Sequence, residues 1–420
     1  MRSDLHIPRT MRALVLRGTG FENLQVEHVQ TPEPGPDQLL ARVDAAGICT
    51  SLIKLVEQGP AHGLLYGWDP SRWPLVLGDE GSITLVKIGA ALEDRYSIGS
   101  RFVVQPAVDY PPVNHRERYL NGAETVRKIA VGYTLAGHLA EYILITEEVI
   151  AAGCLVPVPD PVLPYAHAAM AEPISCVISA QDHHLHIDQQ TPLSERQALS
   201  GLRPGGVTVV VGAGAMGRMH VDLALARRPR AVIVTDPLAE RLRIVQTLFS
   251  ERAVGLGVNL ILVGPSEITE AVAAASEGRG ADDIIVAVAS PPAIQKALPL
   301  AARGAVVNLF GGLKRSEAEV ALDTSIIHYR EINVTGSSGG TPWDVSRTLG
   351  LTAASQIDPG LHIARIGDLN HAVDLLQLVR ARQIDGKAVV YPHRPTDEIL
   401  TVERWTAEDE RLYLSATPQS

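Results

Sequence analysis

Cysteine, positive charge and long apolar runs are all scarce in this sequence. The 420 residues contain three cysteines, Cys49, Cys154 and Cys176, which cannot make a disulfide framework. The formal net charge is -10, which disfavours nucleic acid as a partner. No apolar run reaches the roughly 18 residues of a membrane span, and the first residues lack the apolar core of a signal peptide. We therefore expect a cytoplasmic protein with no membrane partner.

What is present is a globular composition, 46% hydrophobic and 20% charged, in a chain long enough for two domains. Up to about residue 150 the pattern predicts mainly β-structure, because short apolar runs alternate with glycine and proline clusters. Such spacing is typical of a barrel or sandwich. Residues 55–75 and 106–131 are irregular and are expected to form loops over a site.

The strongest motif is a glycine fingerprint that follows a β-branched run at residues 207–211. Gly212 permits a tight turn, Gly214 allows backbone to approach a pyrophosphate, and Gly217 lets the next helix pack closely. That helix is expected over residues 219–227, and its first N–H groups point at the bound anion. The motif predicts a dinucleotide site that also includes Met216. The alternative is a glycine-rich turn without a ligand.

A second apolar strand, residues 231–235, ends in Asp236. An acidic residue about 20 positions after the fingerprint accepts hydrogen bonds from a ribose 2′-hydroxyl. The negative charge of Asp236 opposes a 2′-phosphate, so the sequence favours NAD over NADP.

After the fingerprint, strands and helices alternate, which predicts βαβ units in a doubly wound parallel sheet. The predicted strands are 260–263, 283–289, 305–310 and 331–335, and the predicted helices are 266–276 and 292–301. Beyond Gly340 we expect helices at 343–354 and 369–382, a strand at 387–391, and a charged stretch, 395–420, that forms a short helix or a loose tail.

Three separate stretches carry side chains able to do chemistry. They are Cys49 within residues 47–54, the adjacent carboxylates Asp79 and Glu80, and Glu172 at the start of an apolar helix. Each also has a purely structural interpretation: a packed thiol, a solvated turn and an acid that suits the helix dipole.

Together these motifs resemble the medium-chain zinc-type dehydrogenases, the alcohol and polyol dehydrogenase superfamily. The resemblance runs through Met11-Arg-Ala-Leu-Val-Leu16, Ala46-Gly-Ile-Cys-Thr-Ser51, Gly78-Asp-Glu-Gly81, Ala171-Glu-Pro-Ile-Ser-Cys-Val177, the glycine fingerprint and Lys387-Ala-Val-Val390. Within the superfamily, residues 172–178 and 336–342, and the long connection from Cys176 to Gly205, are similar to the sorbose-1-phosphate reductase and sorbitol dehydrogenase branch.

The resemblance implies an α/β protein: a GroES-like β-barrel catalytic domain, residues 1–177 and 335–420, and a Rossmann domain, residues 178–334, with the active site in the cleft. It also implies a homodimer or homotetramer joined through the edge of the Rossmann sheet.

The resemblance further implies a catalytic zinc ion held by Cys49, Asp79 and Glu172. Asp79 stands where the family has a histidine, and Leu52 stands where an aspartate often orients that histidine. The two changes are consistent with one altered site, since zinc accepts carboxylate oxygen and no imidazole remains to be oriented. Such a site is a weaker Lewis acid and accepts other divalent ions. No cluster of four cysteines exists, so we expect no structural zinc.

Other roles follow by position. Ser51 matches the hydroxyl that relays the substrate proton, and Glu80 matches the glutamate beside the family's histidine ligand. Arg241 matches a basic residue near the adenosine ribose, and Gly311 ends the strand beside which the nicotinamide lies. Lys54 is a candidate to meet a sugar hydroxyl, a phosphate or a relay water, or is a surface lysine.

The predicted reaction is zinc-assisted, NAD-dependent interconversion of a secondary alcohol and a ketone on a polyol, sugar or sugar phosphate. Two alternatives remain open: a zinc-independent quinone or enone reductase of the same superfamily, and an inactive nucleotide-binding regulator.

Overall fold

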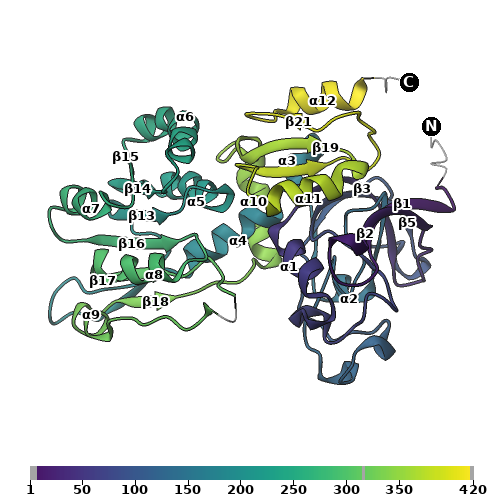
Figure 1. The fold of residues 1–420 in the computed structure, drawn as a ribbon, viewed down its shortest axis with the longest axis horizontal. Helices are drawn as coiled ribbons and strands as arrows, with labels where there is room; N and C mark the ends of the chain where they lie inside the picture. The colour runs from purple at the N-terminus through teal and green to yellow at the C-terminus, as the bar shows by residue number, and fades with distance from the viewer. Residues whose placement is uncertain (1–6, 315–316, 417–420) are drawn as a thin grey trace. The chain divides into compact units, whose positions relative to one another are not determined.

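The protein is described here by a computed structural model that covers residues 7–314 and 317–416. The chain divides into two compact units (Figure 1). Unit 1 comprises residues 1–173 and 341–420, and unit 2 comprises residues 174–340. The sequence-based boundaries fall at 177/178 and 334/335. No helix in the described part of the chain combines the length and the apolar character required to cross a membrane.

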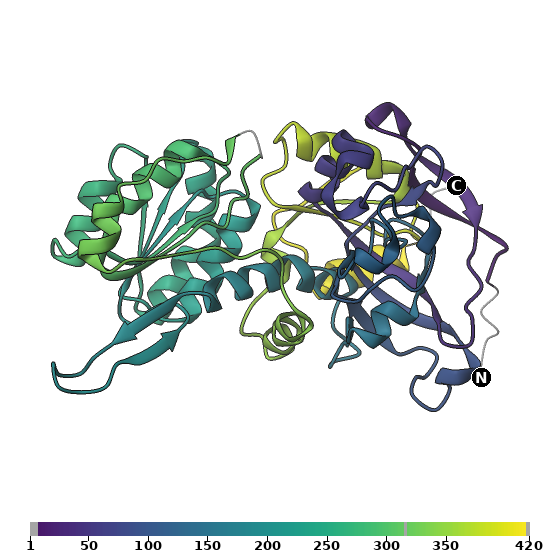
Figure 2. The same ribbon diagram turned by 90° about the horizontal axis from the view of Figure 1, so that it is seen from below.

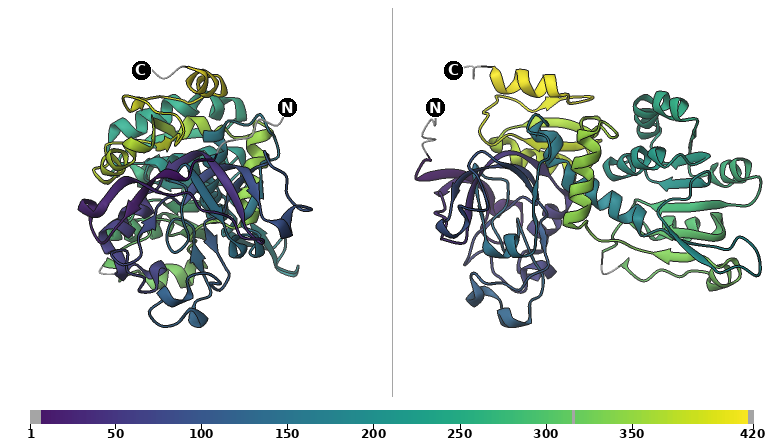
Figure 3. Two further views of the ribbon diagram at one scale, coloured as in Figure 1. Left: turned by 90° about the vertical axis from the view of Figure 1, so that its right-hand side faces the viewer. Right: turned by 180° about the vertical axis from the view of Figure 1, so that it is seen from behind.

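Unit 1 is built mainly from β-strands. They are β1 (Thr10–Leu16), β2 (Leu24–Gln30), β3 (Leu39–Ile48), β4 (Leu75–Val76), β5 (Glu80–Ile88), β6 (Arg101–Val104), β7 (Ala107–Val108), β8 (Ile129–Ala130), β9 (Tyr142–Ile145), β10 (Leu155–Pro157), β19 (Ile363–Gly367), β20 (Lys387–Val390) and β21 (Leu400–Thr401). Its main sheet has the order β10-β6-β5-β3-β20-β19-β21, with β9 also paired to β3. Purple strands from the start of the chain and yellow-green strands from its end thus share one unit (Figure 3).

The central strand of that sheet is β3, whose residues are almost all buried. It pairs antiparallel with β5, β9 and β20, and its unbroken burial shows that both of its faces are covered. The helices of unit 1 are α1 (Thr50–Gln58), α2 (Glu147–Ala151), α3 (Tyr165–Ala169), α10 (Pro342–Ala353), α11 (Ala372–Arg380) and α12 (Ala407–Ser415), and α4 (Ala171–Asp182) continues into unit 2. The predicted β-rich first domain is confirmed.

Unit 2 contains a six-stranded parallel sheet of order β15-β14-β13-β16-β17-β18, with helices on both sides (Figure 2). Its strands are β13 (Val207–Val211), β14 (Ala231–Thr235), β15 (Asn259–Val263), β16 (Ala281–Val286), β17 (Ala301–Asn308) and β18 (Asn333–Thr335). Its helices are α5 (Ala215–Ala226), α6 (Ala239–Leu256), α7 (Ile268–Ser276), α8 (Pro291–Ala297) and α9 (Thr324–Arg330). If these strands are numbered 1 to 6 along the chain, they lie side by side in the order 3-2-1-4-5-6, which is the predicted doubly wound arrangement.

This strand order fixes where a ligand binds to unit 2. The winding reverses between the neighbours β13 and β16, and ligands of such sheets bind outside the carboxyl ends of the strands at that switch point. The glycine fingerprint follows β13 directly and lies at that end.

Several local predictions need correction. The helix predicted over 292–301 ends at Ala297 and continues as a short 3₁₀ turn, Leu298–Leu300, because Pro299 lacks the N–H that an α-helix needs. The stretch predicted as irregular from residue 55 begins inside α1, which runs to Gln58. Neither helix α6 nor the hairpin formed by β11 (Leu185–Asp188) and β12 (Gln197–Ser200) was predicted.

Candidate metal and nucleotide sites

The first candidate site lies where three neighbouring strands of unit 1 meet. Cys49 follows β3 and caps α1, and its Sγ accepts the Ser51 N–H at 3.5 Å. Pairing of β3 with β5 sets Gly47 opposite Glu80, and pairing of β3 with β20 sets Ile48 opposite Ala388, next to Lys387. The sheet register therefore brings residues distant in sequence to one point.

Gly47 leaves room for the Glu80 side chain at that point. A Cβ atom there would lie 2.0 Å from Glu80 Oε2, closer than any real side chain permits. The bare backbone at residue 47 thus lets the Glu80 carboxylate lie across β3 toward Cys49.

Two short hydrogen bonds hold the acidic side chains. Ser51 Oγ donates to Asp79 Oδ2 at 2.5 Å. Lys387 Nζ donates to Glu80 Oε1 at 2.5 Å, and both groups of this ion pair are buried. The other oxygens, Asp79 Oδ1 and Glu80 Oε2, are buried and accept no hydrogen bond. A buried carboxylate oxygen without a partner is costly, so these two atoms favour a cation.

Burial and mutual repulsion shift the pKa values of these groups. Burial, reinforced by the charge of Glu80, raises the pKa of Asp79 to about 6. Burial raises the pKa of the Cys49 thiol well above its ordinary value, and the charges of Asp79 and Glu80 raise it further. Burial alone would lower the pKa of Lys387, but the charge of Glu80 opposes this and the pKa is raised overall. One ammonium thus faces several acidic groups, an imbalance that a divalent cation would relieve.

The donor set fits zinc. Ligand atoms of Cys49, Asp79 and Glu80 all lie within 4.8 Å of one another, and zinc accepts both thiolate sulfur and carboxylate oxygen. Of the predicted ligands, the structure therefore brings Cys49 and Asp79 together, and it adds Glu80, for which the sequence predicted a catalytic role.

Glu172, the third predicted ligand, lies in the first turn of α4 and is 8% exposed. Its charge contributes to the raised pKa of Cys49, after burial and the nearer carboxylates. Helix α3, directly before it, packs on β3 and β5, and Ser82 Oγ donates to the Tyr165 carbonyl at 2.9 Å. Glu172 thus belongs to the electrostatic environment of the cluster, and its ligation stays a prediction.

Sequence reasoning missed Tyr133 and Lys387. Burial, then the charges of Asp79 and Cys49, raises the pKa of Tyr133, which also shares a hydrogen bond with Ser51. Its ring lies 5.3 Å from that of His62. No local motif marks Tyr133. Lys387 is the first residue of a buried strand, and a lysine in that position is a signal that would have indicated a buried ion pair.

The two long irregular stretches of unit 1 pack on each other through aromatic rings. Trp68 and Tyr119 have their centroids 5.9 Å apart, and the Arg118 guanidinium lies 4.8 Å from the Trp68 ring centre. Arg118 is thus engaged with aromatic rings.

The second candidate site is the turn between β13 and α5 in unit 2. Gly212 has φ +103°, and a Cβ on Gly217 would lie 1.8 Å from the Gly212 carbonyl oxygen. Gly214 caps α5 without any side chain, and Met216 lies in the first turn of that helix. Free N–H groups at this helix start suit a phosphate.

Asp236 follows β14 and is 4% exposed. Its Oδ2 accepts the Ala213 N–H at 2.9 Å and its Oδ1 accepts the Leu238 N–H at 2.9 Å. Arg241 Nη1 lies 3.9 Å from Asp236 Oδ2. Gly311 follows β17. A Cβ atom on it would lie 2.3 Å from the carbonyl carbon of Val288 and would collide with that backbone. The predicted cofactor residues thus line the carboxyl end of the sheet.

Comparison with known proteins adds family information. Residues 35–160 match the model for the alcohol dehydrogenase GroES-like domain, and residues 215–354 match that for zinc-binding dehydrogenases. Mannitol-1-phosphate 5-dehydrogenase of Aliivibrio fischeri is 28% identical over 384 residues, covering 89% of this chain and 85% of that protein. L-sorbose 1-phosphate reductase of Klebsiella pneumoniae is 26% identical, covering 92% of this chain and 91% of that protein.

Among solved structures, one described as a zinc-binding dehydrogenase from Sinorhizobium meliloti 1021, bound to NADP, superposes with a TM-score of 0.71. It is 25% identical and covers 92% of this chain and 100% of its own.

Proposed function

We propose a specific reaction for this chain, which belongs to the zinc-type medium-chain alcohol and polyol dehydrogenase family and is an oxidoreductase. The reaction is NAD-dependent interconversion of a secondary alcohol and a ketone on a polyol, sugar or sugar phosphate. The carrying observation is the buried cluster of Cys49, Asp79 and Glu80, whose ligand atoms lie within 4.8 Å of one another and include two unpartnered carboxylate oxygens.

In this proposal Cys49, Asp79 and Glu172 hold the zinc ion, with Glu80 beside them. When bound, the ion polarises the substrate oxygen and lowers the pKa of the alcohol. The Lys387–Glu80 ion pair keeps one carboxylate compensated, so that the cluster does not carry its full negative charge.

Ser51 moves the proton. Its Oγ donates to Asp79 at 2.5 Å and shares a hydrogen bond with Tyr133, so one lone pair stays available to the substrate hydroxyl. A dinucleotide held at the glycine turn would take up the hydride from the alcohol carbon, while Ser51 Oγ would accept the proton of the alcohol oxygen and pass its own proton on toward solvent, so that a ketone would remain. The nicotinamide supplies the redox chemistry and the protein supplies the position.

The experiment that tests this reaction measures bound metal and nicotinamide reduction on one preparation, with a panel of polyols and their phosphates. We expect turnover to require about one bound zinc ion per chain. We also expect activity with at least one polyol or polyol phosphate. Turnover that persists after complete removal of metal, or activity confined to quinones and enones, would contradict the proposal.

Asp236 should favour NAD over NADP, because its charge repels a 2′-phosphate. Replacing Asp236 with asparagine keeps an oxygen that accepts a backbone N–H but removes the charge. We expect the preference for NAD, measured as the ratio of kcat/KM values, to fall about tenfold or more, equivalent to about 1.4 kcal/mol. The control Glu240→Gln, at an exposed acid on α6, should leave the ratio unchanged. A wild-type protein that prefers NADP would refute this assignment.

We propose that Lys54 contacts a distant substrate phosphate. It lies three residues after Ser51 on α1, so the two side chains share one face of the helix. We expect Lys54→Met to raise KM about tenfold for a phosphorylated polyol, with kcat nearly unchanged, because a charge-assisted contact contributes about 1.5–3 kcal/mol. The matched variant Lys296→Met, at an exposed lysine of α8, should change neither value. An equal rise in KM for phosphorylated and unphosphorylated substrates would rule out the phosphate contact.

We also propose a homodimer or homotetramer joined at the β18 edge of the unit 2 sheet. β18 ends the sheet, and Val334 on it is 38% exposed, which leaves an apolar edge to cover. Light scattering of the purified chain tests this assembly.

A reducing cytoplasm is the proposed location, since Cys49 has to stay a free thiol.

A further inference from the structure

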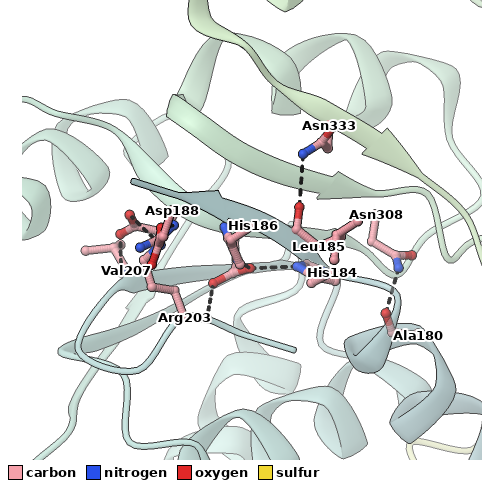
Figure 4. A network of polar contacts seen from close by, with 11 residues as sticks. Ala180, His184, Leu185, His186, Asp188, Arg203, Val207, Asn308 and Asn333 are labelled. Carbon is pink, nitrogen blue, oxygen red and sulfur yellow. Dashed lines mark hydrogen bonds and ion pairs between the residues drawn. The ribbon is translucent and has the colours of Figure 1, made fainter. Parts of the chain in front are cut away.

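A second cluster of side chains of the kinds that ligate metals, His184, His186 and Asp283, lies buried in unit 2 (Figure 4). His184 Nδ1 lies 2.7 Å and His186 Nε2 lies 2.8 Å from the same oxygen, Asp283 Oδ1. All three side chains are at most 1% exposed. The other carboxylate oxygen, Asp283 Oδ2, accepts the Arg203 N–H at 2.8 Å.

The hairpin that carries the two histidines has an unusual pattern. In β11 the outward residues Leu185 and Ile187 are 45% and 48% exposed, whereas the inward residue is His186. Every residue of β12 is exposed. A two-stranded hairpin is only marginally stable by itself, and this one turns imidazoles, not apolar side chains, toward the sheet. The hairpin packs on β17, accepts the Asn333 side-chain N–H at the Leu185 carbonyl at 2.9 Å, and contacts Asp283 of β16 through its histidines.

That contact leaves a charge to be balanced. The Asp283 carboxylate is fully buried, and its polar contacts are with the two imidazoles and the Arg203 backbone N–H. The nearby Arg203 guanidinium pairs with Asp188 and Asp282 instead. A buried carboxylate is stabilised by a cation, and a metal ion among these three side chains would supply one.

Each imidazole makes its polar contact with Asp283 alone. Their remaining nitrogens, His184 Nε2 and His186 Nδ1, are buried and have no hydrogen-bond partner. Thus each ring has one polar contact, and both contacts converge on a single carboxylate oxygen.

We propose that His184, His186 and Asp283 form a structural site for one divalent transition-metal ion, best fitted by zinc, which fastens the β11–β12 hairpin to the sheet of unit 2. Two imidazole nitrogens and a carboxylate oxygen are ligands that zinc prefers. Tetrahedral zinc with ligands at about 2.0–2.2 Å sets neighbouring donor atoms roughly 3.3 Å apart. From the present nitrogen–oxygen distances of 2.7 and 2.8 Å, each imidazole would therefore move away from Asp283 Oδ1 by only about half an ångström when the ion enters.

This ion is distinct from the one proposed at Cys49. Its ligands contain no sulfur and belong to the other unit. It is also not the four-cysteine zinc that the sequence excludes, because that exclusion rested on thiolates alone.

The test uses the full chain with Cys49→Ala, which removes the thiolate site, stripped with a chelator and then titrated with Co²⁺ and Zn²⁺. We expect one equivalent to bind, with a cobalt spectrum that lacks sulfur-to-metal charge transfer. Adding Asp283→Asn should abolish binding, and His186→Gln should do so as a second variant. The matched control Asp282→Asn, which retains an acceptor for the Val207 N–H, should still bind one equivalent.

Stability supplies an independent readout. Chelation of the Cys49→Ala protein should lower the thermal midpoint by about 5 °C, as expected when a tight ligand is withdrawn, and should not affect the version that also carries Asp283→Asn. If Cys49→Ala binds no metal, or if binding survives both Asp283→Asn and His186→Gln, the inference is wrong. The inference is also wrong if the Cys49→Ala substitution removes every metal ion that the wild-type protein binds. That result would not depend on the unit 2 variants.

Discussion

Replacing Cys49 with alanine should remove the metal ion from the unit 1 site and lower kcat/KM about a thousandfold. The thiolate is the only sulfur ligand in the cluster of Cys49, Asp79 and Glu80. Without it the remaining carboxylates bind a divalent ion weakly, and polarisation of the substrate oxygen is lost. A Lewis acid contributes several kcal/mol to such a transition state, and about 4 kcal/mol corresponds to a factor of a thousand. Metal analysis and steady-state kinetics on the same sample measure both effects.

Cys154→Ala is the matched control for this variant. Cys154 is a free, buried cysteine of the same unit, and its sulfur makes only long contacts with carbonyl oxygens at 3.7 and 3.9 Å. We expect it to cost roughly 1 kcal/mol of stability through a small cavity while metal content and turnover stay unchanged. Full activity in Cys49→Ala would remove the basis of the proposed reaction.

Replacing Gly217 with alanine should weaken binding of the dinucleotide at least about a hundredfold. The new Cβ would lie 1.8 Å from the Gly212 carbonyl oxygen, which is backbone and cannot rotate away. The turn and the start of α5 therefore have to separate, and the N–H groups that face the phosphates move with them. A displacement of about 1 Å in such a site costs about two orders of magnitude. Titration of NADH fluorescence measures the affinity.

Gly255→Ala is the control for that change. Gly255 lies in α6, and a Cβ there would meet nothing within 4 Å. Alanine is a better helix former than glycine by about 1 kcal/mol, so this variant should bind the dinucleotide normally and unfold at a slightly higher temperature. If Gly217→Ala and Gly255→Ala bind NADH equally well, the glycine turn is not the phosphate site.

The sheet of unit 2 was predictable because its strands are apolar and its glycine spacing has a mechanism. The end of α8 was less so, since Pro299 sits inside an otherwise helical pattern. Helix α6 escaped prediction because charged and apolar residues interleave along it, and only three of its residues are buried. The β11–β12 hairpin escaped because its inward side chains are histidines, which a search for apolar alternation does not find.

In the unit 1 site, too, some residues were predictable from the sequence and others were not. Cys49 and Asp79 belong to sequence motifs, so their proximity was predictable. The position of Glu80 depends on the register of β3 with β5 and on the missing side chain of Gly47, neither of which sequence spacing reveals. Tyr133 and Lys387 reach the cluster only through tertiary packing, from a loop and from a strand near the end of the chain.

The most direct measurement of the central claim is the absorption spectrum of the cobalt-substituted protein, recorded together with its turnover. The account predicts sulfur-to-cobalt charge transfer in the wild type, its loss in Cys49→Ala, and its retention in Asp283→Asn, with turnover following the band. A cobalt-loaded wild type without that band, or a band that persists in Cys49→Ala, would contradict it.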